Sequence, residues 1–366
     1  MRICFLGWEN LSVLAPEFHP EGIGGEQVQH TLLAKALVRR GHQVSMVVHD
    51  HGQPDRSCWH GIVTYKAFRP EAGIPVFRYI HPRWTGAWAA LERADANVYY
   101  ASCAGMHVGL LALFCKNKGR KFVFRVAHDT DCEPDKVMIR YWRDRKLYEY
   151  GLRHASGIFA QSAKQQRAML MNYGLQSKVA EMLVDRPERE VKRDIDVLWV
   201  NNLRQFKRPD LFLELAKRLP QLSFHMVGGA PPGFDALFES IKQQASKVPN
   251  LVFHGHIPYQ ETGLKYARTR IFVNTSDSEG FPNSYLQAWV RGTPVVAFFD
   301  PDGVIRRERL GAAVSSIDQM TDVVRKLAAD QAYWSETSKR CKEYMARTHD
   351  EDCILAPYLE LFEQRT

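Results

Sequence analysis

The chain has 366 residues, of which 45% are apolar and 25% charged, and this balance excludes an intrinsically disordered protein. The length allows two domains, each with its own core. Residues 1–188 carry 25 Lys/Arg and 18 Asp/Glu, a net charge of +7, whereas residues 189–366 carry 24 and 23, a net charge of +1. A basic first half indicates an anionic partner (a phosphorylated substrate, a membrane or a nucleic acid) or merely a solvated charged face.

The seven cysteines form no CxxC pair, which indicates free thiols in a reducing compartment. The apolar run after Arg2 is too short for a signal peptide, and no segment is long enough to cross a membrane. We therefore expect a cytoplasmic protein, which could still bind a membrane surface from that side.

Apolar strands alternate with amphipathic helices along the first half of the chain. The predicted strands are residues 2–8, 43–50, 97–103, 121–129 and 155–162, and the predicted helices are residues 26–42, 105–119 and 163–174. One face of the first helix is apolar, through Val28, Leu32, Leu33, Ala36 and Leu37. Gly41 is placed to end this helix.

A charged segment, residues 185–194, predicts a linker, after which the alternation restarts. Further strands are predicted at residues 197–202, 223–229, 251–255, 271–275 and 294–298. Further helices are predicted at residues 208–219, 233–245, 259–268, from about 283, 331–347 and 351–364.

This alternation predicts an α/β protein with parallel sheets covered on both faces. We expect two doubly wound, Rossmann-like domains that face a cleft, with ligands beyond the carboxyl ends of the strands. The expected domains are residues 1–188 and residues 189–347. Because no strand follows the last helix, residues 348–366 are expected to cross back to the first domain.

Two stretches of the first half carry polar or glycine residues at strand ends. Gly24 and Gly25 precede a helix, where backbone can approach a ligand, although their spacing is not the dinucleotide fingerprint and a plain glycine turn is the alternative. His128 could orient a hydroxyl or accept a proton, or be structural. Asp129 and Asp131 could share a divalent cation, but we favour a capping role.

Two stretches of the second half suggest an anion site. Arg204, Lys207 and Arg208 follow a strand and suit a diphosphate, with a solvated basic turn as the alternative. In the stretch EGFPNS, Pro282 suits the first helical turn, and Asn283 and Ser284 suit capping. Gly292 and Pro294 are placed to end that helix. Glu279 and Gln287 are expected to face one ligand from its two ends.

Four stretches of the sequence together resemble the retaining GT-B glycosyltransferases of family 4. EGFPNSYLQAWVRGTPVVA is similar to the E-x7-E region of this family, and GGEQVQHTLLAKALVRRGHQV to its glycine loop and first helix. NNLRQFKRPDLFLELAKRLP resembles its phosphate-binding segment, and HMVGG with LVFHGHIPYQE resembles the segments around the base. The resemblance spans most of the chain in the same order, and it is greatest to bacterial exopolysaccharide and surface-glycan transferases.

The resemblance implies a set of donor contacts. Gly24 and Gly25 would approach the donor diphosphate, which Lys207 neutralises with help from Arg204. Position 287, here Gln287, would bind ribose hydroxyls. The remaining donor contacts it implies are Ile257 near the base, Glu279 at sugar hydroxyls, and the phosphate-binding backbone of Gly280, Phe281, Pro282, Asn283 and Ser284. His128, Glu279 and Lys207 would be the catalytic residues, with His128 beside the transferred sugar.

The resemblance also implies a reaction. A sugar would move, with retention and without a metal or other cofactor, from a nucleotide-diphosphate sugar to a glycan or lipid-diphosphate acceptor. The donor would bind the second domain and the acceptor the basic first domain, and an anionic membrane surface is a further expected partner. A sugar-nucleotide hydrolase or epimerase and a non-catalytic sugar-nucleotide binder are the alternatives. No interleaved basic and aromatic patch supports nucleic-acid binding.

The sequence departs from the family pattern at two places. The family has Gly-Arg where this chain has Asn201 and Asn202, and Arg204 could supply the missing charge. The second Glu of E-x7-E is Gln287, which keeps hydrogen bonding but lacks the charge-assisted bond. We expect this change to cost about 1 kcal/mol of binding free energy or less.

Overall fold

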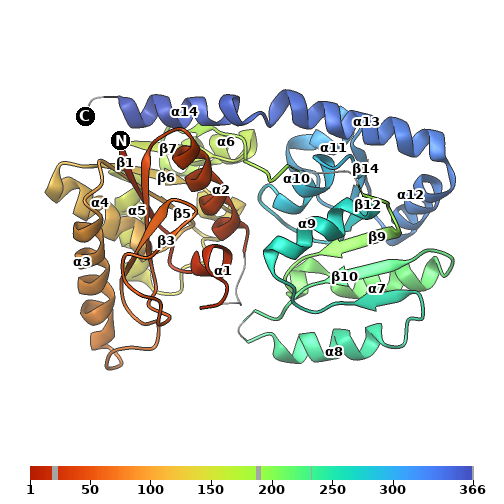
Figure 1. Ribbon diagram of the computed structural model, residues 1–366, viewed down its shortest axis with the longest axis horizontal. Helices are drawn as coiled ribbons and strands as arrows, with labels where there is room; N and C mark the ends of the chain where they lie inside the picture. Colours follow the sequence, from red (N-terminus) through yellow and green to blue (C-terminus); the bar gives the residue numbers. More distant parts are fainter. Residues whose placement is uncertain (19–23, 187–190, 232, 365–366) are drawn as a thin grey trace. The chain divides into compact units, whose positions relative to one another are not determined.

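The computed structural model of the protein describes residues 1–18, 24–186, 191–231 and 233–364. The chain forms two α/β units (Figure 1): unit 1 is Met1–Leu183 with Glu351–Thr366, and unit 2 is Val184–Asp350. The division after Leu183 lies five residues before the expected boundary, and residues 187–190 of the predicted linker lie outside the described residues. The two parallel-sheet α/β domains expected from the alternation are confirmed.

Unit 1 is built on an eight-stranded sheet with the order β3-β4-β2-β1-β5-β6-β7-β8. Its strands are β1 (Arg2–Leu6), β2 (Gln43–Val48), β3 (Cys58–Trp59), β4 (Ile62–Lys66), β5 (Val98–Ser102), β6 (Lys121–Arg125), β7 (Gly157–Ala160) and β8 (Lys178–Val179). Its α-helices are α1 (Leu11–Leu14), α2 (Gly25–Arg39), α3 (Thr85–Ala94), α4 (Met106–Lys118), α5 (Trp142–Arg153), α6 (Ala163–Tyr173) and α14 (Glu351–Glu363). Among the described strand pairs of this sheet, only β3–β4 is antiparallel.

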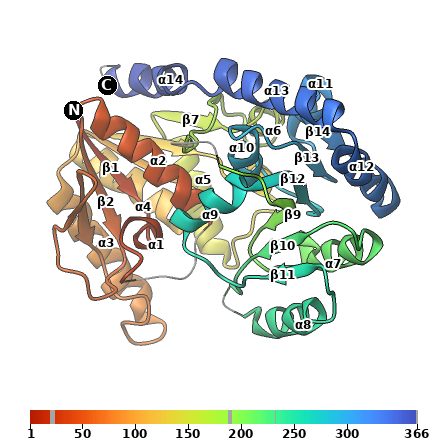
Figure 2. The ribbon, with the colours of Figure 1, turned by 45° about the vertical axis from the view of Figure 1, so that its right-hand side comes forward.

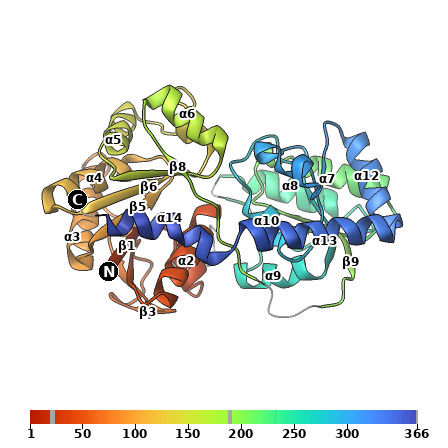
Figure 3. The ribbon, with the colours of Figure 1, turned by 90° about the horizontal axis from the view of Figure 1, so that it is seen from above.

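Helices cover both faces of the unit 1 sheet. Apolar residues of α3, α4, α5 and α6 share one buried core with alternate residues of the strands. Helix α14 runs along the other face of the sheet (Figure 3). There, Tyr358 of α14 packs 4.3 Å from Phe159 of β7, measured between ring centroids. Lys121 Nζ donates to the carbonyl oxygens of Leu361 and Phe362 near the end of α14, at 3.1 and 3.2 Å. These contacts place the last helix in unit 1, where the sequence analysis expected residues 348–366.

Unit 2 is built on a six-stranded parallel sheet with the order β11-β10-β9-β12-β13-β14. Its strands are β9 (Ile195–Val200), β10 (Phe224–Val227), β11 (Leu251–Phe253), β12 (Thr269–Asn274), β13 (Val295–Ala297) and β14 (Gly311–Ala313). Its α-helices are α7 (Pro209–Arg218), α8 (Asp235–Ala245), α9 (Tyr259–Ala267), α10 (Asn283–Trp289), α11 (Val304–Glu308), α12 (Ile317–Ala329) and α13 (Gln331–Thr348).

Both faces of the unit 2 sheet are also covered. Helices α7, α8 and α12 share a buried core with β9, β10 and β12, and α8 lies beside β11 (Figure 2). On the other face, Phe272 of β12 packs between Tyr266 of α9 and Tyr285 of α10, with ring centroids 5.4 and 6.4 Å away. Among the described helices, none combines the length and apolar character required to cross a bilayer.

Two glycines allow α4 and α5 to approach closely in unit 1. A Cβ atom at Gly109 would lie 2.3 Å from the Leu147 carbonyl oxygen, and one at Gly151 would lie 2.5 Å from the Val108 carbonyl carbon. Both distances are far below van der Waals contact with backbone, which cannot rotate away. The helix pair that supports β5 and β6 therefore requires glycine at both positions.

We expect Gly109→Ala to lower the free energy of unfolding of unit 1 by about 1–3 kcal/mol, because the added methyl group overpacks the contact with α5. Alanine would otherwise favour the helix by about 1 kcal/mol. Urea unfolding followed by circular dichroism measures the difference. Asn117→Ala, at an exposed position of the same helix, is the control and should leave stability unchanged or slightly raised. Equal stability of Gly109→Ala and the wild type would contradict the close contact.

Candidate active site

The direction in which strands are added to the sheet reverses once in each unit. In unit 2, the sheet grows from β9 to β10 and β11 on one side, and then from β12 to β13 and β14 on the other. In unit 1 the same reversal separates β1 from β5. Ligands of doubly wound sheets bind beyond the carboxyl ends of the strands at such a switch point. Each unit therefore offers one expected binding position.

Lys207 and Glu279 meet at the switch point of unit 2. Lys207 lies in the short turn Gln205–Lys207 that follows β9, and Glu279 lies in the loop that follows β12. Lys207 Nζ lies 2.5 Å from each carboxylate oxygen of Glu279, and the two side chains are only 13% and 10% exposed. Two opposite charges with so little water around them stabilise each other, and removal of either would leave a buried charge without compensation.

Hydrogen bonds from the central strands hold this ion pair in place. Trp199 Nε1 donates to Thr275 Oγ1 at 3.0 Å, and the Thr275 hydroxyl donates to the Lys207 carbonyl oxygen at 2.8 Å. Asn274 Nδ2 donates to Glu279 Oε1 at 3.4 Å. Because β9 and β12 carry these groups, both charged side chains have fixed positions at the edge of the sheet.

The other two cations of this segment differ in their partners. Arg208 Nη2 donates to Asp210 Oδ2 at 2.9 Å, and this bond raises the pKa of Arg208. The Arg208 guanidinium also lies 3.7 Å from the Asp277 carboxylate. No carboxylate in the described part of the chain pairs with Arg204, whose guanidinium lies 5.9 Å from the ring centroid of Phe234. Arg204 is thus available to an anionic ligand, whereas Arg208 stabilises the start of α7.

Helix α10 begins differently from the prediction. Asn283 is its first helical residue, and the preceding Pro282 has extended backbone, with φ −72° and ψ 120°, and provides no side-chain cap. The expected capping by Asn283 and Ser284 is therefore wrong, because both residues already lie inside the helix. The expected end is confirmed: Gly292 has φ +68° and its amide donates to the Trp289 carbonyl at 2.8 Å.

Gln287 lies in a buried chain of hydrogen bonds. Arg291 Nη1 donates to Gln287 Oε1 at 2.6 Å, Gln287 Nε2 donates to Tyr259 Oη at 3.1 Å, and Tyr259 Oη donates to Asp185 Oδ2 at 2.7 Å. Burial lowers the pKa of Arg291, and burial together with the Asp185 charge raises that of Tyr259. Each end of the Gln287 amide keeps the capacity for one more hydrogen bond. A ribose hydroxyl could therefore still be bound.

The loops after β9, β10 and β11 lie beside one another. A Cβ atom at Gly228 would lie 2.2 Å from the Asn201 carbonyl oxygen, so glycine allows the ends of β9 and β10 to approach. Asn201 and Asn202 occupy the turn between β9 and Lys207, where the family pattern has Gly-Arg. Ile257 is half-buried in the loop between β11 and α9, two residues before Tyr259.

In unit 1, Gly24 and Gly25 lie at the start of α2, as predicted. Gly24 has extended backbone, and its amide donates to Gln27 Oε1 at 3.0 Å. A Cβ atom at Gly24 would lie 2.8 Å from this oxygen. Gly25 is the first residue of the helix and is exposed. The backbone of the first turn therefore faces solvent at a helix N-terminus, where anions are stabilised.

His128 follows β6 and has a defined tautomer. The Thr130 amide donates to His128 Nδ1 at 3.2 Å, so the neutral ring carries its proton on Nε2 and can donate it to a ligand oxygen. Asp131 accepts the amides of Ala127 and His128 at 3.0 and 2.9 Å, which confirms the capping interpretation. Asp129 instead binds Lys164 Nζ at 2.6 Å and accepts from Gln165 Nε2 at 3.0 Å, so the capping role expected for Asp129 is wrong. The two carboxylates have separate structural roles.

Glu26 is a titratable residue of this region that sequence reasoning did not single out. It lies in the first turn of α2, where its carboxylate accepts from Ser102 Oγ of β5 at 3.2 Å and lies 3.9 Å from His30 Nε2. Burial, reinforced by the Asp131 carboxylate, raises the pKa of Glu26 to about 7. The motif GGEQ could have identified this residue as part of the site. Glu26 directly follows Gly24 and Gly25, which lie at the switch point between β1 and β5.

The raised pKa of Glu26 predicts a pH-dependent effect of Glu26→Gln. The folded state holds the Glu26 proton up to about pH 7, whereas an unfolded glutamate releases it near pH 4.5. The contribution of this proton to the free energy of unfolding of the wild type is therefore lost as the pH rises between these values. Relative to the wild type, the variant should gain about 1–2 kcal/mol of unfolding free energy from pH 4.5 to pH 8. Denaturant unfolding at both values measures this gain. Glu17→Gln, at an exposed site of unit 1, controls for lost surface charge, and a gain that does not grow with pH contradicts the assignment.

The sequence matches two glycosyltransferase family models. Residues 24–183, in unit 1, match a model described as a glycosyl transferase 4-like domain. Residues 194–330, in unit 2, match a model described as glycosyl transferases group 1. Together the two matches cover most of the chain in the order that the family requires.

Curated relatives match over shorter stretches. The O-antigen biosynthesis glycosyltransferase WbnH of Escherichia coli is 35% identical over 100 residues, which is 27% of either chain. The alpha-galactosylglucosyldiacylglycerol synthase of Streptococcus pneumoniae is 24% identical over 171 residues, which is 46% of either chain. The matched part thus spans between about a quarter and a half of these relatives' length.

Solved structures match over the whole chain. HepE of Anabaena, determined with UDP and glucose, has a TM-score of 0.76 and 15% identity over 100% of both chains. WaaG, a glycosyltransferase involved in lipopolysaccharide biosynthesis, has a TM-score of 0.68 and 15% identity over 98% of both chains. At these identities the similarity establishes the fold. Family models and fold agree with the motifs of the sequence, and the chain therefore belongs to the GT4-type glycosyltransferases with the GT-B fold.

Proposed function

We propose that the protein is a metal-independent, retaining glycosyltransferase that moves a sugar from a nucleotide-diphosphate sugar to a glycan or lipid-linked acceptor. The contact between Lys207 and Glu279 at the switch point of unit 2 carries this proposal. It pairs a cation suited to a diphosphate with a carboxylate suited to sugar hydroxyls, at the position where this fold binds ligands. The relatives' roles in O-antigen and glycolipid synthesis support a glycan or lipid-linked acceptor.

The remaining candidate residues would complete the donor site. The Gln287 amide would bind ribose, the backbone near Ile257 would meet the base, and Arg204 would add a second positive charge at the diphosphate. The Asn283 and Ser284 amides, in the first turn of α10, would bind phosphate oxygens. Pro282 has no amide hydrogen, so this residue of the expected set would not donate to phosphate.

In the proposed reaction, the acceptor hydroxyl attacks the anomeric carbon on the face from which the diphosphate leaves. The bond from that carbon to the phosphate oxygen breaks, and the leaving phosphate takes the acceptor proton. Lys207 and Arg204 would stabilise the negative charge that develops on the diphosphate. His128, with its proton on Nε2, would donate to the transferred sugar. We propose that unit 1, which carries most of the net positive charge, holds the acceptor.

Two other functions would use the same residues. A sugar-nucleotide hydrolase or epimerase would consume the donor without an acceptor, and a non-catalytic binder would take up the donor without turnover. An assay with the donor alone, followed by one with an acceptor pool, separates all three.

We expect Lys207→Ala to lower the turnover number by at least about a hundredfold, because the leaving diphosphate loses its nearest charge. The variant also leaves Glu279 unpaired, so folding is checked by circular dichroism. Release of nucleoside diphosphate in the presence of an acceptor pool measures turnover. Lys217→Ala removes an exposed lysine from α7 and should retain wild-type activity. Near-normal turnover of folded Lys207→Ala would refute the donor site.

We further propose that unit 1 binds an anionic membrane from the cytoplasmic side. Two loops of this unit carry large apolar side chains that are each more than half exposed: Ile74, Val76, Phe77, Ile80, Met138, Tyr141 and Trp142, here called the apolar loop surface. The Arg143 guanidinium lies 4.0 Å from the ring centroid of Tyr79 and 5.3 Å from that of Tyr141, which places the two loops side by side. Arg140 and Lys136 add exposed positive charge. Aromatic and apolar side chains with basic neighbours suit the membrane interface.

This part of the proposal is tested by flotation with vesicles that contain one third phosphatidylglycerol, at low salt. The wild type should float. The double variant Phe77→Ser with Trp142→Ser should lose at least about tenfold in partitioning, because both changes remove apolar area that the membrane would bury. Met171→Ser removes another highly exposed apolar side chain, from α6, and should float as the wild type does. Equal flotation of the double variant, or no wild-type binding, would exclude this surface.

A further inference from the structure

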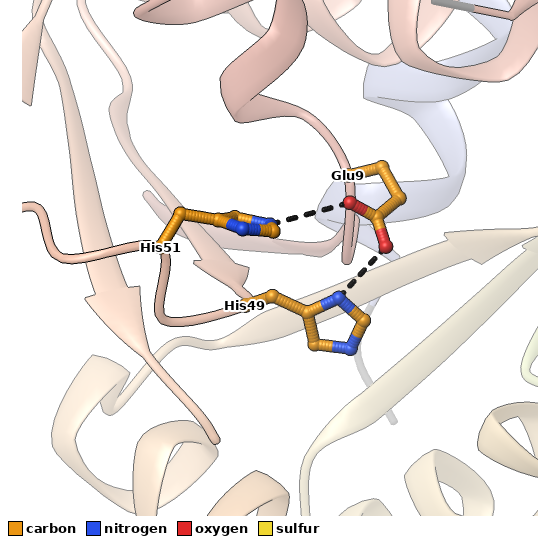
Figure 4. Close-up of side chains that lie close together, drawn as sticks. All are labelled: Glu9, His49 and His51. Atoms are coloured by element: carbon orange, nitrogen blue, oxygen red, sulfur yellow. Dashed lines mark hydrogen bonds and ion pairs between the residues drawn. The ribbon is translucent and has the colours of Figure 1, made fainter. Parts of the chain in front are cut away.

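Three potential metal ligands meet at the sheet edge of unit 1. Glu9 follows β1, and His49 and His51 follow β2. These strands are parallel neighbours, with Leu6 beside Val47, so the residues after them share one edge. One donor atom from each of the three side chains lies within 4.8 Å of the others. Figure 4 shows both imidazoles turned toward the Glu9 carboxylate.

The Glu9 carboxylate lies between the two rings. His49 Nδ1 lies 2.8 Å from Glu9 Oε1, and His51 Nε2 lies 3.4 Å from Glu9 Oε2. The exposed fractions of the side chains are 12% for His49, 16% for His51 and 34% for Glu9. The imidazoles are thus largely removed from water, and the atoms Glu9 Oε2 and His51 Nε2 are themselves buried, while the rest of the Glu9 side chain is partly exposed.

The surrounding structure fixes the two histidines. Gln53 is fully buried, and its side chain donates to the His49 carbonyl at 2.7 Å and accepts from the His51 amide at 2.8 Å. The Trp8 ring stacks on the His49 ring, with centroids 5.2 Å apart and planes 12° apart. Orientation of ligand side chains by such neighbours is typical of metal sites, where outer contacts hold the imidazoles for the ion.

We propose that Glu9, His49 and His51 bind a divalent transition-metal ion, for which Zn²⁺ is the reference. Two imidazoles and one carboxylate are a common ligand set for such ions and leave an open coordination position. Ligand atoms about 2.0–2.2 Å from the ion require donors roughly 3.3 Å apart. Because the donor atoms lie within 4.8 Å of one another, the widest pair needs to close by at most about 1.5 Å. The inference goes beyond the proposed transfer, since no donor residue named above takes part.

Calorimetric titration of Zn²⁺ into the chelator-treated chain tests the proposal. The wild type should bind one ion at this site, and His49→Gln and Glu9→Gln should each weaken binding at least about tenfold, the usual range for lost metal contacts. His154→Gln, which removes an exposed histidine elsewhere in unit 1, is the matched control and should bind as the wild type does. Zn²⁺ should also raise the unfolding temperature of the wild type and the control only.

Titration with Co²⁺ provides a second readout that does not depend on activity. The wild type and His154→Gln should develop a visible absorption band at one equivalent, and folded Glu9→Gln and His49→Gln should not. A hydrogen-bonded triad that holds no metal would give neither heat nor absorption in the wild type. Either that result, or binding unchanged in both cluster variants, would overturn the proposal.

Discussion

The ion pair between Lys207 and Glu279 is the interaction on which the proposed donor site depends. Both side chains are nearly removed from water, so each charge is tolerated because the other lies 2.5 Å away. The pair can form only where β9 and β12 are neighbours, at the point where the sheet of unit 2 reverses its growth. Topology therefore creates the pair, and in the proposed function one ligand would meet both the cation and the carboxylate.

The alternation of strands and helices was sufficient to predict the architecture of both units. Long, apolar strands such as β5 and β9, and amphipathic helices such as α2 and α7, have patterns that tertiary contacts reinforce. The pattern did not reveal β3, β4, β8 and β14, nor the helices α1, α3, α5, α11 and α12. Strands β3 and β8 have two residues each, which is too short to carry a period. Their places are set by pairing with a neighbouring strand, which is a long-range interaction.

The candidate site could be predicted only in part. Lys207 and Glu279 were recognised through their motifs, but the contact between them joins residues far apart in the chain. The hydrogen-bond chain from Gln287 to Tyr259 and Asp185 was not predicted, because these residues lie on separate segments with no shared motif. The capping prediction at Asn283 failed because Pro282 extends the backbone and shifts the helix start by one residue. The raised pKa of Glu26 likewise depends on burial that local sequence does not encode.

The division of labour between the two charged residues is the central claim, and calorimetric titration of Glu279→Gln tests it most directly. The wild type is first titrated with UDP-, GDP- and ADP-sugars to find the preferred donor, and then with the matching nucleoside diphosphate. If Glu279 binds the sugar and Lys207 the diphosphate, Glu279→Gln should weaken binding of the nucleotide sugar at least about tenfold, the loss expected for a charge-assisted hydrogen bond. Binding of the nucleoside diphosphate should stay equal or become tighter. An equal loss for both ligands, or no loss for either, would contradict the account.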